Sequence, residues 1–278
     1  MSPLPRQPYG DASLAMAVCE LPDGLTPGDA AWQRLVSLVD THRPQALLLN
    51  ELPFGAWPAA APRFCLHEAG QAAAAHAAGV AALDAIAVPA LFGSTALPAP
   101  DGLINEGFAR IGTRYHALHH KLCLPEEAGF HENTWFRPGH QTFGLLDHAG
   151  FRFAFAICSE LMVPEVGRSL VRAGADVLLV PRASTADGLD RWIAVARATA
   201  IVNGCYVLSS NRSGGGGTVP AFGGSGFAVA PGGEVLALTT PDDPLVVVSL
   251  SRDSLAGARA QYPLTISAHL DLPSPRPR

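Results

Sequence analysis

Hydrophobic side chains alternate with small ones along residues 151–157, and this period of two predicts a β-strand. Continuous apolar runs at 46–49 and 177–180 are typical of strands that are covered on both faces. The same criteria predict further strands at 13–19, 85–89, 205–209, 227–230, 234–238 and 245–250.

Hydrophobic positions spaced three and four residues apart predict helices between these strands. The first is expected to follow Thr26, a candidate N-cap with Pro27 in the first helical position, and to end before Pro44. Others are expected over 62–79, 164–173 and 189–203. Strands that alternate with helices predict an α/β fold.

Turn-forming residues predict loops and hairpins in the remaining segments. Residues 93–101 are expected to be a Pro-rich loop, and 104–118 a hairpin that turns at 105–107. Another hairpin is expected where 143–146 pairs with 151–157. The glycines at 214–217 predict a surface loop, because no Gly-Lys-Ser or Gly-Lys-Thr follows to make a phosphate-binding loop.

The composition is that of a globular chain that can bury a full core, with 278 residues of which 48% are hydrophobic and 15% charged. We expect one domain over 13–271, preceded by a loose leader at 1–12 and followed by a mobile Pro-rich tail at 272–278. A net charge of −5 without a basic run argues against a nucleic-acid partner. No uninterrupted apolar run is long enough to predict a membrane partner.

The cysteines and histidines suggest no metal site and no disulfide framework. Five cysteines occur without a Cys-x-x-Cys pair, so reduced thiols in a cytoplasmic protein are expected. His116, His119 and His120 lie close in sequence, but no carboxylate or thiolate follows at the spacing of a metal site.

Three predicted strands end in a residue that could take part in chemistry: Glu51, Lys121 and Cys158. Ligands of α/β sheets gather at the carboxyl ends of strands. Cys158 lies where a strand turns toward a helix that begins near Pro164, so backbone N–H groups could stabilise a thiolate there. Taken singly, each residue could also be structural, as an exposed glutamate, a solvated lysine or a buried cysteine.

Three motifs carry these residues: Asn50-Glu51-Leu52-Pro53, His120-Lys121-Leu122 and Ile157-Cys158-Ser159-Glu160. In this order, and with Ser210-Asn211-Arg212 further on, the chain resembles the nitrilase superfamily of carbon–nitrogen hydrolases over about residues 14–250. The resemblance implies a four-layer αββα sandwich that forms a homodimer or a higher oligomer. It also implies a cysteine hydrolase that needs no cofactor and no metal.

The resemblance further implies a role for each residue. Cys158 would be the nucleophile, Glu51 the general base and Lys121 the cation that faces the oxyanion. The second glutamate of many members falls best on Glu132, with Glu126 and Glu127 left open.

Five residues are expected to bind substrate: Ser159, Trp57, Trp135, Glu160 and Arg182. The backbone N–H of Ser159 would face the oxyanion. The two tryptophans would form an apolar wall, although aromatic side chains more often belong to a core. Arg182 stands where many relatives carry less charged sequence.

The reaction implied is hydrolysis of a small to medium amide or carbamoyl compound by water, through a thioester. The Cys-Ser-Glu motif with Pro164-Glu165 downstream favours an amidase. Two alternatives stay open, a nitrilase that converts a nitrile to an acid and ammonia, and a non-catalytic binding protein with the same fold.

Overall fold

The computed structural model describes residues 13–140 and 143–264, so the expected leader at 1–12 and tail at 272–278 lie outside the described residues. A single 13-stranded sheet runs through the molecule and is folded into two halves. The first half contains β1 (Ser13–Pro22), β2 (Ala46–Leu48), β3 (Ala90–Ala99), β4 (Gly102–Ile111), β5 (Arg114–His120) and β15 (Leu245–Ser251). The second contains β8 (Leu146–His148), β9 (Phe151–Phe155), β10 (Val177–Arg182), β11 (Tyr206–Gly216), β12 (Val219–Gly223), β13 (Phe227–Val229) and β14 (Val235–Leu238).

Strand β1 joins the two halves. Its residues from Ser13 to Cys19 pair antiparallel with β15, whereas Glu20 pairs in parallel with Asn211 of β11, and Pro22 with Ser213. The end of β1 therefore carries the sheet from one half into the other.

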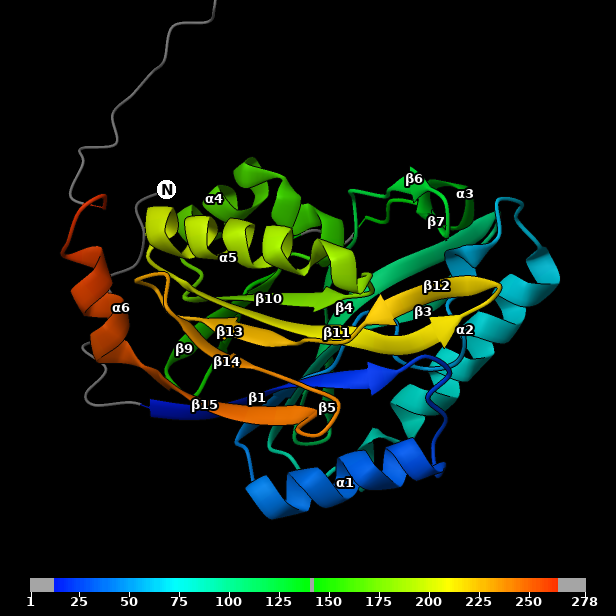
Figure 1. Cartoon of the computed structure of the whole chain (residues 1–278), viewed down its shortest axis with the longest axis horizontal. Helices are drawn as coiled ribbons and strands as arrows, with labels where there is room; N and C mark the ends of the chain where they lie inside the picture. Colours follow the sequence, from blue (N-terminus) through cyan, green and yellow to red (C-terminus); the bar gives the residue numbers. More distant parts are fainter. Residues whose placement is uncertain (1–12, 141–142, 265–278) are drawn as a thin grey trace, which may run out of the picture.

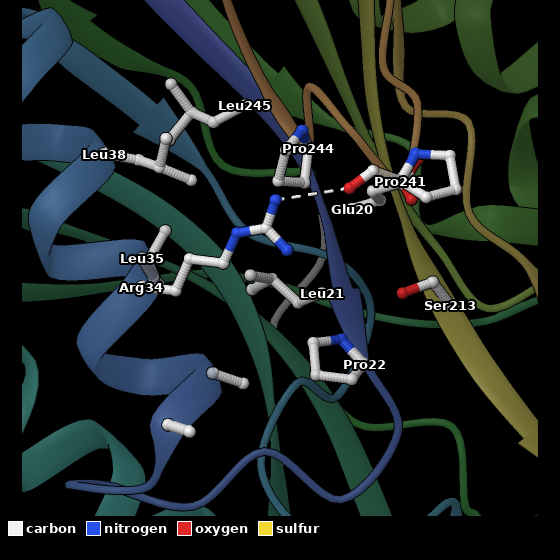
Figure 2. A pocket seen from close by; sticks show the side chains of 12 residues that line it. Glu20, Leu21, Pro22, Arg34, Leu35, Leu38, Ser213, Pro241, Pro244 and Leu245 are labelled. Atoms are coloured by element: carbon white, nitrogen blue, oxygen red, sulfur yellow. Dashed lines mark hydrogen bonds between the residues drawn. The ribbon is translucent and has the colours of Figure 1, made fainter.

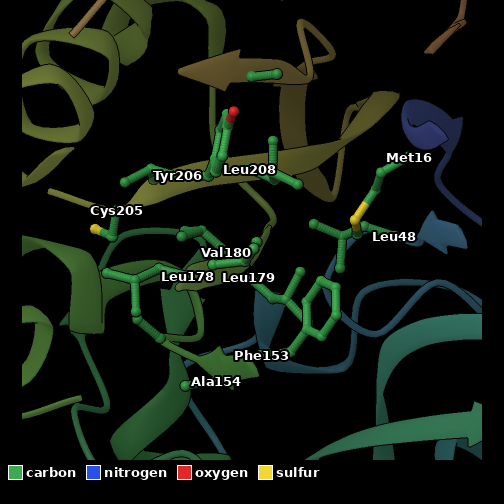
Figure 3. Packing of buried hydrophobic residues seen from close by; sticks show 14 of the residues in the cluster. Met16, Leu48, Phe153, Ala154, Leu178, Leu179, Val180, Cys205, Tyr206 and Leu208 are labelled. Atoms are coloured by element: carbon green, nitrogen blue, oxygen red, sulfur yellow. The ribbon is translucent and has the colours of Figure 1, made fainter. Parts of the chain in front are cut away.

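The main core lies between the two halves. Met16 of β1 and Leu48 of β2 belong to one apolar cluster with residues of β9 and β10. Figure 3 shows Phe153 pointing toward both of them, and the rings of Phe92 and Phe153 lie 4.8 Å apart. Because side chains alternate along a strand, Ala17 of β1 and the other strand residues of its apolar cluster face the opposite way, toward the helices.

Helices cover the outer face of each half, which gives four layers in the order αββα. Helices α1 (Ala30–His42) and α2 (Leu66–Ala81) cover the first half, and α4 (Pro164–Ala173) and α5 (Leu189–Asn203) the second (Figure 1). The expected sandwich is confirmed. Shorter elements are α3 (Glu132–Trp135), α6 (Arg252–Arg259), β6 (Glu126–Glu127), β7 (Phe130–His131) and the 3₁₀ turns η1 (Pro58–Ala60), η2 (Leu83–Ala85), η3 (Cys158–Met162) and η4 (Ala186–Gly188).

Several predicted boundaries are confirmed. Helix α4 occupies the predicted residues, with Pro164 at its first position, and α5 ends at Gly204 in the left-handed conformation. The hairpins β8–β9 and β13–β14 form as expected. None of the helices among the described residues is long and apolar enough to cross a membrane.

Other predictions are wrong. Helix α1 begins at Ala30, since Asp29 and not Thr26 caps it by accepting the Trp32 N–H. The strand expected at 85–89 begins only at Ala90, because these residues form the end of η2 and an irregular segment. Most of the loop expected at 93–101 belongs to β3, and the turn expected at 105–107 lies inside β4. These two strands pair along their whole length, and that pairing outweighs the local preference of Gly, Ser and Pro for loops. The glycines at 214–217 are exposed as expected, but the first three extend β11 to Gly216 and only Gly217 lies in the turn that leads to β12.

Candidate active site

Four buried side chains converge where β2, β5 and β9 end. The Lys121 Nζ lies 2.7 Å from Glu51 Oε1 and 2.6 Å from Glu132 Oε2. Cys158, which starts η3, interacts electrostatically with all three. Glu51 and Lys121 are fully buried, and Glu132 and Cys158 nearly so. Three residues expected from separate strand ends are thus brought together, and Glu132 joins them.

The two carboxylate oxygens of Glu51 differ in their hydrogen bonding. Its Oε1 accepts hydrogen bonds from Lys121 Nζ and, at 2.8 Å, from Asn105 Nδ2. Its Oε2 is buried and has no hydrogen-bond partner among the described residues. The next residue, Leu52, is in the left-handed conformation with φ 46°, and its carbonyl accepts from the Arg212 guanidinium. The carboxylate therefore keeps one oxygen available as a proton acceptor.

Lys121 and Glu132 form a tightly coupled pair. Burial lowers the pKa of Lys121, but Glu132 and Glu51 outweigh it and hold the pKa above its ordinary value. Burial raises the pKa of Glu132 to about 8, opposed by Lys121 and reinforced by Glu51. Lys121 therefore stays a cation. Glu126 and Glu127 lie in the exposed strand β6, away from this pair.

Cys158 occupies a strained turn, with φ 48° at a residue that is not glycine. The backbone N–H of Ala183 lies near the sulfur and acts to lower the pKa of the thiol. Burial raises the pKa of the thiol, Glu51 raises it further, and Lys121 lowers it. Burial and Glu51 raise the thiol pKa more than the expected helix end lowers it, so the sequence-based expectation of a stabilised thiolate is not met. The resting group is a thiol whose proton a base must remove.

The predicted substrate-binding residues differ in their surroundings. The Ser159 hydroxyl donates to the Cys123 carbonyl, at 2.5 Å, and is half-buried. The Glu160 carboxylate is fully buried behind Cys158 and accepts from backbone N–H groups. Neither side chain is free to point into a cavity.

The tryptophans lie in an apolar cluster next to the four residues. Trp57 packs edge-on against Phe130 and Phe222, with ring centroids 5.9 and 6.0 Å away. Trp135 packs against Phe64 and donates its indole N–H to the Ala61 carbonyl. Both tryptophans are almost fully buried, which is typical of residues of the hydrophobic core.

Arg182 is buried at the carboxyl end of β10. Its guanidinium donates to the hydroxyls of Ser209 and Ser184 and to the Ser225 carbonyl. Burial lowers its pKa to about 10, and Cys158 opposes that change. A positive charge therefore lies within electrostatic reach of the sulfur.

Two groups of the site were not predicted. Asn105 lies in the segment that the sequence predicts to be a turn, and its neighbours Glu106 and Gly107 favour that prediction, so no local signal marks its contact with Glu51. The Ala183 N–H carries no sequence signal, because any residue supplies a backbone donor.

No group of three His, Cys, Asp or Glu side chains among the described residues is arranged to hold a metal ion.

A separate hollow of about 390 Å³ lies between α1 and the end of β1, where Arg34 donates to the Pro241 carbonyl (Figure 2). Its lining is mostly apolar and includes none of the four converging residues.

Comparison with known proteins gives a consistent result. The sequence model described as carbon–nitrogen hydrolase matches residues 71–260. A deaminated glutathione amidase of Synechocystis sp. is 31% identical over 153 residues, which are 54% of this chain and 56% of that protein. An N-carbamoylputrescine amidase of Oryza sativa subsp. japonica is 27% identical over 158 residues, 51% of this chain and 52% of that protein. The chain spans about half the length of the curated relatives it matches.

The fold is similar to that of solved structures over almost the whole chain. A carbon–nitrogen hydrolase from Helicobacter pylori G27 superimposes with a TM-score of 0.76 at 19% identity, covering 91% of this chain and 94% of that one. At this identity the similarity concerns the fold.

Proposed function

Since the chain belongs to the carbon–nitrogen hydrolase family, we propose that it is an amidase that hydrolyses a small to medium amide or carbamoyl compound through a thioester on Cys158. One observation carries the proposal. Glu51 has Oε1 fixed by Lys121 and Asn105, while its buried Oε2 has no hydrogen-bond partner among the described residues, and the carboxylate lies within electrostatic reach of the Cys158 thiol. A carboxylate so arranged suits proton transfer in both directions.

In the first step the Cys158 sulfur attacks the carbonyl carbon of the substrate, and Glu51 takes the thiol proton. The carbonyl electron pair moves onto oxygen, where the Lys121 ammonium and the Ser159 backbone N–H stabilise the negative charge. The raised pKa of Lys121 supports this role, because the group stays charged.

In the second step the carbon–nitrogen bond breaks and Glu51 returns the proton to nitrogen, so that ammonia or an amine leaves. Water then enters and gives a proton to Glu51, and its oxygen attacks the thioester carbon. The acid departs and the Cys158 sulfur regains its proton. Acid–base and oxyanion groups of this kind are each worth about a hundredfold or more in rate.

The substrate class rests on the relatives and is the proposal's broadest part. One is named for deaminated glutathione and the other for N-carbamoylputrescine, an amide and a carbamoyl compound.

The test is release of ammonia or amine from matched panels of amides, carbamoyl compounds and nitriles. We expect turnover of amides or carbamoyl compounds, and its loss in Cys158→Ala but not in Cys205→Ala, which changes a buried cysteine of the main core. Acid formation from nitriles alone would favour the nitrilase. Turnover that survives Cys158→Ala would overturn the thioester mechanism, and binding without turnover of any panel would favour the non-catalytic alternative.

A homodimer or higher oligomer and a cytoplasmic location remain predictions. Light scattering on the purified chain, coupled to size exclusion, measures the first. Fractionation of cells that express the tagged chain measures the second.

A further inference from the structure

A fully buried carboxylate behind the nucleophile turn accepts hydrogen bonds from every side. Glu160 Oε2 accepts the Ile157 N–H at 2.8 Å, and Oε1 accepts the Leu122 N–H at 2.8 Å. The His119 Nε2 lies 3.0 Å from Oε1 and 2.8 Å from Oε2. Neither oxygen is therefore left for a substrate.

The two backbone donors belong to different halves of the sheet. Ile157 directly precedes Cys158, at the end of β9, and Leu122 directly follows Lys121, at the end of β5. Glu160 thus joins the backbone of the proposed nucleophile to the backbone of the proposed oxyanion cation. Hydrogen bonds to a charged group are stronger than neutral ones, so the Glu160 carboxylate holds these two backbone segments firmly together.

His119 is held in one tautomer. The Phe143 N–H donates to Nδ1 at 3.2 Å, so Nδ1 is an acceptor and the proton lies on Nε2, which faces Glu160. The His119 ring also stacks on Phe143, with centroids 4.6 Å apart and planes inclined by 16°. All groups around Glu160 are thereby donors.

We infer, on the basis of the proposed function, that Glu160 held by His119 is a positioning residue that fixes the Cys158 sulfur relative to the Lys121 ammonium. The substrate-binding role expected for Glu160 is replaced in this proposal. The charged groups that face Cys158 are Glu51, Lys121, Glu132 and Arg182, so a change in its distance from Lys121 alters its titration.

Glu160→Gln is the test, because the amide has almost the same shape but must turn its NH₂ group toward an N–H donor whichever way it lies. We expect kcat to fall on the order of 100-fold, the effect of a displacement of about 1 Å, with KM changed less than about twofold. We also expect the pH profile of Cys158 alkylation by iodoacetamide, followed by peptide mass spectrometry, to shift from that of the unchanged protein, because the distances from the sulfur to Lys121 and Glu51 change.

Asp176→Asn is the matched control. Asp176 is also a buried carboxylate that accepts a backbone N–H, that of Arg152 at 3.1 Å, and it pairs with Arg252 and Arg259, but it precedes β10 at the end of that strand opposite to Arg182. We expect kcat and the alkylation profile to stay within about twofold of the unchanged protein. An equal loss in both variants would overturn the proposal.

If Glu160→Gln fails to fold, His119→Gln replaces it, since this variant keeps the carboxylate and both backbone bonds. We expect a loss of about tenfold with the same direction of the pH shift. A folded variant of Glu160 or His119 with unchanged kcat and unchanged alkylation profile would show a structural role alone. The alkylation profile needs no turnover, so it tests the positioning even if Cys158→Ala disproves the amidase.

Discussion

At the scale of single residues, two carboxylates share one ammonium group. Glu51 and Glu132 both contact Lys121, so the buried set carries an excess negative charge when all three are ionised. The like charges repel in a region that water does not screen. The pKa of Glu132 is therefore raised, by burial first and with Lys121 opposing, to about 8.

This raised pKa predicts a pH-dependent stability. The ordinary value is 4.5, so the folded state binds more protons than the unfolded state between pH 4.5 and about 8. The free energy of unfolding therefore falls as the pH rises through this range, and the contribution of Glu132 is fully present only below it. In Glu132→Gln this fall disappears, so the Tm of the variant minus that of the unchanged protein should rise by about 2 °C or more from pH 5 to 8.

Thermal unfolding at several pH values measures this difference. The control is Glu127→Gln, which alters an exposed glutamate nearby and should give the same Tm difference at each pH. A flat difference for Glu132→Gln would contradict the raised pKa.

The contact of Asn105 with Glu51 Oε1 gives a prediction for activity. Asn105→Ala removes the 2.8 Å hydrogen bond to the carboxylate, which frees its rotation and leaves only Lys121 to hold it. A hydrogen bond to a charged group is worth about 1.5–3 kcal/mol, so kcat/KM should fall roughly 10- to 100-fold. Asn105→Asp should be worse, because it places a carboxylate against a carboxylate. Steady-state kinetics measure both, with exposed Asn133→Ala as control, and an unaltered kcat/KM in Asn105→Ala would refute the role.

At the scale of elements, the sequence predicts what local pattern determines. Helix α4 is found at its predicted residues because Pro164 and the hydrophobic spacing act within one element. Strands β3 and β4 are mispredicted, since the pairing of the two strands, and not their own conformational preference, holds Gly93 and Asn105 in strands. Glu51 and Cys158 follow apolar runs that are visible in the sequence, and Lys121 follows the second strand of the predicted hairpin. Their convergence depends on how the sheet folds, which only the family resemblance suggested.

Helix α2 offers a paired test of packing. Gly79 is buried, and a Cβ on it would overlap the Phe54 ring, whereas Gly70 on the same helix has open space around it. Gly79→Ala should therefore lower the free energy of unfolding by about 1–3 kcal/mol. Gly70→Ala should raise it by up to about 1 kcal/mol, the gain in helix propensity. Urea denaturation measures both values, and equal effects of the two substitutions would mean that the Phe54 contact does not limit the helix.

At the scale of the whole molecule, the candidate site is divided between the halves of the sheet. Glu51, Asn105 and Lys121 extend from the first half, and Cys158 and the Ala183 N–H from the second. The geometry of the site therefore depends on the distance at which the halves pack. At one close contact, a Cβ on Gly107 of β4 would lie 2.9 Å from the Phe155 ring of β9.

Gly107→Ala should separate the halves at this contact and so move Lys121 and Glu51 away from Cys158. Because a small misplacement costs much in rate, we expect kcat to fall about tenfold or more while the protein stays folded. Phe155→Leu creates space in the core at a cost of about 1–3 kcal/mol in stability. If the increased separation of the two halves causes the loss, the double variant Gly107→Ala, Phe155→Leu should recover part of the kcat lost in Gly107→Ala. A double-mutant cycle would then give a favourable coupling. Strictly additive losses in kcat would instead mean that the spacing of the halves at Gly107 does not set the geometry of the site.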